Sequence, residues 1–158
     1  MIRSGAAKPR FALDTNLLVY SVDNAAGIRH ELAADIVLRA VRQDCWLSLQ
    51  AVSEFYAAVT RKGIMPRSVA AARANDWLIA FPCAGVSASA VRTALTDAVA
   101  GRASYWDALL VATAGEAGCT LILTEDLAHG STLGGVEIHN PFTPRGGLTR
   151  RARRLLEL

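Results

Sequence analysis

The sequence predicts an α/β fold, with a mostly parallel central sheet of about four or five strands covered by helices on both faces. Short apolar runs alternate along the chain with longer segments in which apolar residues recur at helical spacing. The clearest short run, residues 120–124, is apolar throughout its centre, which is typical of a strand buried on both faces. The chain has 158 residues, 52% of them hydrophobic, and this is enough for one hydrophobic core.

The first half of the chain begins with an apolar run that polar residues interrupt. Residues 28–42 carry apolar side chains at helical spacing, Gly63 ends a second amphipathic segment, and Pro66 begins a third. In order, we expect a strand at 11–13, a short helix after Asn16, a helix at 28–42, a strand at 45–48, and helices at 50–61 and 66–80.

The second half repeats this alternation. Ser87 is a suitable N-cap for a helix to about residue 100, and small residues in 105–117 allow that helix to pack closely on a sheet. In order, we expect a strand at 84–86, helices at 87–100 and 105–117, strands at 120–124 and 136–138, and a terminal helix at 148–158.

Four acidic residues occupy positions that such a sheet would bring together. Each has an ordinary explanation when taken alone: a helix cap, a solvated helix charge, a helix-start carboxylate or a turn residue. In a parallel sheet, however, the carboxyl ends of the strands meet at one edge, where ligands bind. These residues are Asp14, Glu54, Asp107 and Asp126.

Carboxylates gathered at one edge repel one another and raise one another's pKa unless a cation offsets their charge. Mg²⁺ and Mn²⁺ bind carboxylate oxygens and water, and they lower the pKa of a water nucleophile beside a phosphate. The three histidines, His30, His129 and His139, show no metal-ligand spacing. The sequence therefore favours a hard divalent ion held by acids.

Several short motifs in this order resemble the PIN domain, and within it the VapC toxins of bacterial toxin–antitoxin pairs. The similarity runs from Phe11 to Phe142. It implies a PIN-like α/β/α sandwich, a Mg²⁺- or Mn²⁺-dependent ribonuclease activity, a cognate antitoxin and homodimer formation. The motifs that carry it are Asp14-Thr15-Asn16, Ser53-Glu54, Ser104-Tyr105-Trp106-Asp107-Ala108, Leu123-Thr124-Glu125-Asp126-Leu127 and Asn140-Pro141-Phe142.

The resemblance also implies roles for individual residues. Asp14, Glu54, Asp107 and Asp126 match the family's acidic site, and we expect all but Glu54 to bind the metal directly. Glu125 adjoins Asp126 and is the alternative ligand, but the family's Thr-x-Asp register favours Asp126. The smaller polar residues, which would orient the acids or water, are Thr15, Asn16, Ser104 and Thr124.

The net charge of +3 is unevenly distributed. Five of the 17 basic residues and one of the 14 acidic residues lie in the last 14 positions, which leaves 12 basic and 13 acidic residues elsewhere. We therefore divide the chain into a PIN-like nuclease domain, 1–143, and an arginine-rich C-terminal tail, 144–158. The tail either binds RNA phosphates or an acidic partner, or is a solvated terminal segment. Its candidate RNA contacts are Arg150, Arg151, Arg153 and Arg154.

The expected location is the cytoplasm, without membrane attachment. The three cysteines are scattered singly in or beside apolar runs, as in a reducing compartment. Basic residues, including Arg3, precede an apolar stretch that Asp14 interrupts, which argues against a signal peptide. No uncharged apolar run approaches the roughly 18 residues of a membrane helix.

Two other functions fit part of the pattern. A haloacid-dehalogenase-like phosphatase would use Asp14 as a nucleophile, but such enzymes have a second aspartate at the position of Asn16 and a lysine near the site. A phospho-receiver domain also needs a late lysine, and the last lysine here is Lys62. The other alternative is a non-catalytic module that binds RNA or a protein through the arginine tail.

Overall fold

The computed structural model describes residues 7–158, and its centre is a six-stranded sheet with the order β3-β2-β1-β4-β6-β5. All neighbouring strands are parallel except β5 and β6. Arg3, on which part of the argument against a signal peptide depended, lies outside the described residues. The strands are β1 (Phe11–Leu13), β2 (Cys45–Ser48), β3 (Cys83–Ala84), β4 (Leu121–Leu123), β5 (Thr132–Leu133) and β6 (Val136–His139).

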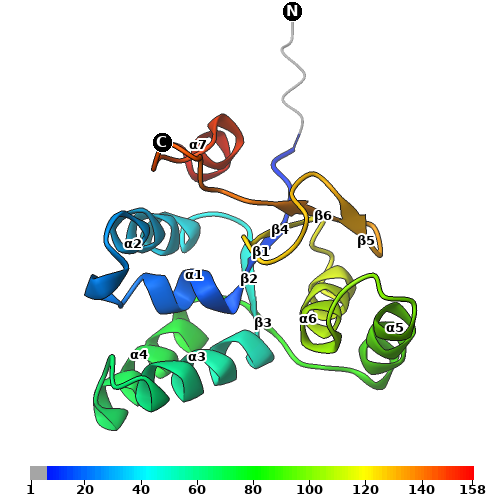
Figure 1. The fold of residues 1–158 in the computed structure, drawn as a ribbon, viewed down its shortest axis with the longest axis horizontal. Coiled ribbons are helices and arrows are strands. Elements are labelled where there is room, and N and C mark those ends of the chain that lie inside the picture. Colours follow the sequence, from blue (N-terminus) through cyan, green and yellow to red (C-terminus); the bar gives the residue numbers. More distant parts are fainter. Residues whose placement is uncertain (1–6) are drawn as a thin grey trace, which may run out of the picture.

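Helices cover both faces of this sheet, so the predicted α/β/α architecture is confirmed. In Figure 1, α1 to α4 lie on one side of the strands and α5 and α6 on the other. A short 3₁₀ helix, Asn24–Ala26, links α1 to α2. The α-helices are α1 (Thr15–Tyr20), α2 (Ile28–Ala40), α3 (Leu49–Arg61), α4 (Arg67–Ala80), α5 (Ala88–Val99), α6 (Tyr105–Glu116) and α7 (Arg150–Leu156).

The predicted helix starts are confirmed by their caps. The Ser87 hydroxyl accepts the Ala90 N–H at 2.9 Å, and the Ser104 hydroxyl accepts the Asp107 N–H at 3.3 Å. Pro66 precedes the first residue of α4. The side-chain acceptors satisfy N–H groups that a helix start leaves without partners, which fixes where each helix begins.

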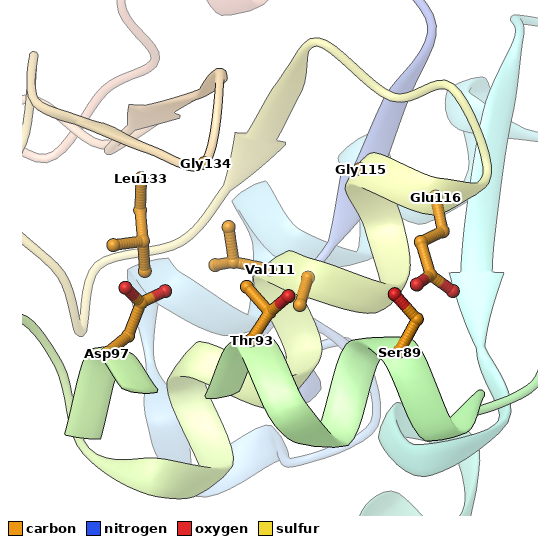
Figure 2. Close-up of a pocket in the computed structure, with 9 residues that line it drawn as sticks. Ser89, Thr93, Asp97, Val111, Gly115, Glu116, Leu133 and Gly134 are labelled. Carbon is orange, nitrogen blue, oxygen red and sulfur yellow. The ribbon is translucent and has the colours of Figure 1, made fainter. Parts of the chain in front are cut away.

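The sequence prediction missed β5. This strand has only two residues, an exposed Thr132 and a half-buried Leu133 that lines a cavity beside α5 and α6 (Figure 2), so it has no buried alternation to reveal it. It pairs with β6 through a two-residue turn, Gly134-Gly135, in which both φ angles are positive, at 56° and 79°. Only glycine adopts such a turn without strain, and a Gly-Gly pair between short apolar runs is a hairpin signal.

The core includes the C-terminal helix. Ala152 and Leu156 of α7 are 0% and 1% exposed, and Leu155 is also buried in the main apolar cluster. Arg151 forms an ion pair with Glu137 of β6. Residues 150–156 are therefore not a solvated terminal segment, because their apolar face packs on the same core as the sheet. Across the described part of the chain, no helix combines the length and apolar character needed to cross a membrane.

Candidate active site

The site lies where the chain order in the sheet reverses. From β1 the chain builds outward to β2 and β3, and it then returns to place β4 on the other side of β1. In open α/β sheets, a crevice forms at the carboxyl ends of the two strands at this switch point. Asp14 directly follows β1 and Thr124 directly follows β4, so both lie at this crevice.

Hydrogen bonds join the ends of these two strands. The Thr124 hydroxyl donates to Oδ2 of Asp14 at 2.6 Å, and the Asp14 N–H donates to the Leu123 carbonyl at 3.1 Å. The Thr124 hydroxyl oxygen also accepts the N–H of Asp126 at 3.1 Å. One threonine therefore positions both acids, and the Asn16 side chain donates a further hydrogen bond to the Asp126 carboxylate.

Glu54 reaches the same place from α3, which packs on α1. Its two carboxylate oxygens have separate donors: the Thr15 hydroxyl at 3.0 Å and the Gln50 amide at 2.7 Å. Gln50 precedes Glu54 by one helical turn, so the two side chains lie on one face of α3. These donors fix the orientation of the carboxylate.

Asp107 is presented by the first turn of α6. The Ser104 hydroxyl lies 2.7 Å from Oδ2 of Asp107, in addition to capping the helix. A carboxylate in the first turn of a helix is stabilised by the helix dipole, which is worth about 0.3–1 kcal/mol. The local sequence therefore holds the Asp107 carboxylate in place at the helix start.

All four predicted acids line one cavity of about 300 Å³. Two of the predicted smaller polar residues, Thr15 and Asn16, also line it, whereas Ser104 and Thr124 hydrogen-bond to acids in its wall. The complete lining is Asp14, Thr15, Asn16, Glu54, Ala57, Ala58, Arg61, Lys62, Asp107 and Asp126.

The electrostatics of the cavity centre on Asp14, whose side chain is almost entirely buried. Burial is the main cause that raises the pKa of Asp14 from 3.8 to about 7, and the negative charge of Asp126 raises it further. The hydrogen bond from Thr124 acts in the opposite direction. A nearby cation would reverse the effect of burial and charge repulsion, because it favours the ionised carboxylate.

The donor set fits a hard divalent cation. Within residues 7–158, no three acidic, histidine or cysteine side chains form a ready-made metal cage. Mg²⁺ does not require such a cage, because it keeps several water ligands and is commonly bound by one or two carboxylates. Asp14 and Asp126 repel each other in the same cavity, with Asp107 in its wall, so the chemistry of the lining favours such an ion.

The two adjacent acids after β4 have different surroundings. Glu125 accepts a hydrogen bond from the Tyr20 hydroxyl at 2.6 Å and forms an ion pair with Arg29 at 3.0 Å. Burial acts to raise its pKa, but the hydrogen bonds from Arg29 and Tyr20 hold the pKa of Glu125 below its usual value. Asp126, by contrast, lines the cavity. Glu125 therefore joins α1 and α2 to the end of β4.

A PIN domain family model matches residues 11–130. The chain belongs to the PIN domain family. This segment contains all four acids of the cavity and the residues that hydrogen-bond to them. Membership of this family excludes the haloacid-dehalogenase-like and phospho-receiver alternatives.

Two solved structures share the fold of this PIN domain. VapC20 of Mycobacterium tuberculosis, described as a sarcin-ricin loop cleaving toxin, is 19% identical with a TM-score of 0.58, over 71% of this chain and 86% of that one. VapBC2 of Rickettsia felis, bound to a DNA fragment from its promoter, is 14% identical with a TM-score of 0.59, over 82% of this chain and 97% of that one. The comparison with curated proteins found no match.

Two basic residues of the PIN domain's cavity were missed by the sequence prediction. Arg61 and Lys62 end α3, and both are exposed. They follow Glu54 by seven and eight residues, which places them two turns further along the same helix face. That spacing was a usable signal once Glu54 was singled out.

The arginines of α7 lie at the opposite end of the PIN domain's strands from the acidic cavity. Arg151 and Arg154 line a cavity with Lys8 and Pro9, which precede β1, whereas Asp14 follows β1. In Figure 1, α7 lies near the start of β1, and α1 begins at its opposite end. The structure therefore does not bring the α7 arginines to the acidic cavity, and RNA contact by them stays a prediction.

Proposed function

We propose that this PIN domain protein is a divalent-metal-dependent endoribonuclease and the toxin of a toxin–antitoxin pair. One observation carries the proposal: four acids from separate elements, Asp14, Glu54, Asp107 and Asp126, line a single cavity. The family membership supports it, and so does the fold shared with VapC20, which is described as a sarcin-ricin loop cleaving toxin.

In this proposal, Asp14, Asp107 and Asp126 would hold Mg²⁺ or Mn²⁺, which when bound supplies a water nucleophile of lowered pKa and offsets charge on the phosphate. Glu54 orients the attacking water, because both of its oxygens are already fixed by Thr15 and Gln50. Asn16 and Thr124 hold the Asp126 side chain and backbone in position.

The substrate is RNA, and its backbone is held by the basic end of the cavity. Arg61 and Lys62 are the two cationic residues of a lining that also holds four acids, and both are exposed to an incoming RNA strand. Phosphate contacts of this kind position a nucleic acid without reading its sequence. The arginines of α7 would contact only an RNA long enough to reach the opposite end of the sheet's strands.

The proposed biological setting consists of an antitoxin partner, self-association and a cellular compartment. The likeness to VapBC2 and to the VapC20 toxin supports a cognate antitoxin for this chain. We also propose that the chain forms a homodimer and acts in the cytoplasm. The cysteines support that compartment, because Cys45 and Cys119 are free thiols buried in the apolar core.

The test is cleavage of RNA by the purified protein with Mg²⁺ or Mn²⁺ and with a chelator. We expect cleavage only with the metal, and none from the double variant Asp14→Asn/Asp107→Asn, which should still fold. Asp76→Asn is the matched control, because Asp76 is an exposed carboxylate on α4 outside the cavity. Undiminished turnover by the double variant would refute the proposal. Sequencing RNA ends from cells that express the protein would then identify the target.

A further inference from the structure

A second cavity adjoins the acidic one. Its volume is about 430 Å³, and its lining is Gln50, Ser53, Glu54 and Trp106. Glu54 also lines the acidic cavity, so the two cavities share a wall. Trp106 directly precedes Asp107 at the start of α6. A ligand in the second cavity would therefore lie immediately beside the proposed site of cleavage.

Trp106 is unusually exposed for so large an aromatic side chain. It is 62% exposed, whereas Trp77 is 5% exposed and packs against Phe55. A single exposed apolar residue needs no explanation by itself. Here, however, the side chain forms a wall of a cavity next to a cluster of acids. Its ring is therefore placed to contact a ligand of the acidic site.

The position of Trp106 is fixed by its neighbours. The Tyr105 and Trp106 rings are 5.0 Å apart in an edge-to-face arrangement, which is a favourable geometry for aromatic pairs. The Gln50 amide donates to the Trp106 carbonyl at 3.1 Å, and this bond ties α3 to the start of α6. The backbone of the wall is therefore held in place before any ligand arrives, which lowers the ordering cost of binding.

Gln50 contributes a second, independent observation. Its Nε2 group donates to Glu54 and to the Trp106 carbonyl, but its Oε1 atom is buried and has no hydrogen-bond partner among the described residues. A buried acceptor without a donor is costly and uncommon in native proteins. Because this atom has almost no exposed surface, the N–H or O–H groups of a ligand would satisfy it once the Gln50 amide shifts toward the cavity that the residue lines.

We propose that Trp106 and Gln50 form a nucleobase-binding subsite that takes one unpaired base of the RNA strand next to the scissile bond. The inference rests on the proposed ribonuclease function. A base offers a flat face to the indole ring and N–H groups to the Gln50 acceptor. Stacking on an aromatic side chain is the usual way in which proteins hold bases of single-stranded RNA.

This subsite gives the bound RNA strand a direction along α3. Gln50 lies at the start of α3, with Trp106 of α6 beside it, and Arg61 lies at the end of α3. Glu54 lies between them. At 1.5 Å per residue, Gln50 and Arg61 are about 16 Å apart along the helix axis. The strand would thus have a base held at one end of the acidic cavity and a phosphate held at the other. A duplex cannot offer the face of a stacked base, so the subsite selects unpaired RNA.

The test measures RNA binding separately from cleavage. One probe is a fluorescein-labelled, single-stranded RNA of ten nucleotides with mixed sequence. The other is the same labelled sugar–phosphate chain without bases. The protein is titrated into each probe in the presence of a chelator, and binding is measured by fluorescence anisotropy. For the wild type, we expect the RNA to bind more tightly than the abasic chain. Trp106→Ala should lose most of that preference, roughly 5- to 150-fold in affinity, and bind the abasic chain as before.

Two further variants keep the result interpretable. Trp106→Phe retains an aromatic face and should keep most of the preference. Tyr56→Ala removes an exposed aromatic side chain from α3 outside both cavities, and it should match the wild type. Thermal unfolding of each variant checks the fold.

Three results would overturn the inference. These are an unchanged base preference in Trp106→Ala, an equal loss of affinity for both probes, and a change of molecular mass in solution without a change in RNA binding. The last would identify the Trp106 surface as a contact between copies of this chain. Because binding is measured without metal, a failure of RNA cleavage with Mn²⁺ would count against the ribonuclease proposal and not against this one.

Discussion

The hydroxyl group of Thr124 donates a hydrogen bond of 2.6 Å to the carboxylate of Asp14, and these residues are 110 positions apart in the sequence. The bond joins the carboxyl ends of β1 and β4, where the sheet order reverses. It also favours the ionised form of Asp14, against the burial that raises the pKa of this residue to about 7. The behaviour of the site with pH should therefore depend on these two side chains.

Asp14 should make the metal-free protein less stable as the pH rises. Its pKa is about 7 in the folded protein and about 3.9 in an unfolded chain. The folded state therefore binds the proton more tightly than the unfolded state, so protonation of Asp14 stabilises the fold. This stabilisation is complete below about pH 4 and is lost as the pH rises through 7. We expect Asp14→Asn, which stays neutral, to exceed the wild type by on the order of 2–4 kcal/mol at pH 8.5, by less at pH 5, and to match it below about pH 4.

Urea unfolding in a chelator at several pH values measures this difference. Added Mg²⁺ should narrow it at pH 8.5, because the ion favours the ionised carboxylate of the wild type. Stability curves for the two proteins that run parallel from pH 5 to 8.5 would contradict the buried, proton-binding state of Asp14.

Removing the Thr124 hydroxyl should shift the pH dependence of cleavage. Valine has nearly the same shape as threonine but cannot donate to Asp14, so the pKa of Asp14 should rise further in Thr124→Val. The acidic limb of the pH–rate profile should move to higher pH, and kcat/KM at pH 7 should fall roughly tenfold or more, as for a lost hydrogen bond to a charged group. Thr124→Ser keeps the hydroxyl and should retain the wild-type profile. Identical profiles for the valine and serine variants would count against this role.

The two acids after β4 should respond in opposite ways to loss of charge. Asp126→Asn should lower cleavage by at least the 10- to 100-fold that is typical of weakened metal ligation, with little change in stability. Glu125→Gln should keep most of the activity but lose about 1–2 kcal/mol of stability, because it weakens the bonds to Arg29 and Tyr20. Parallel activity assays and urea unfolding check both outcomes. Loss of cleavage in Glu125→Gln at unchanged stability would reverse the assignment.

Much of the fold was predictable because local patterns and tertiary structure agree. The strand at 120–124 has the apolar centre of a doubly covered strand, and the structure places β4 there, in the middle of the sheet. The C-terminal helix was predicted, but not its packing. Its arginines dominate the composition, while the apolar stripe of Ala152, Leu155 and Leu156 has the i, i+3, i+4 spacing of a buried face.

The acids of the site were predictable for a different reason. Asp14 and Asp126 follow parallel strands, and the carboxyl ends of such strands meet wherever the sheet order places them. The partners of a side chain carry no comparable signal in the sequence. Nothing local indicates that Glu125 binds Arg29, or that the acceptor of Gln50 is left without a donor, because both depend on how helices pack.

The basic end of the cavity should govern RNA affinity and its salt dependence. In the proposed mode of RNA binding, Arg61→Ala and Lys62→Ala would each remove one phosphate contact. Each should therefore raise KM and reduce the slope of log K against log salt by about 1, with kcat nearly unchanged. Arg150→Ala and Arg153→Ala are matched controls, because they remove exposed arginines of α7, which lies at the opposite end of the sheet's strands. With a short RNA they should behave as the wild type. If the α7 variants reduced the salt slope and the α3 variants did not, the RNA path would run along the C-terminal helix instead of the acidic cavity.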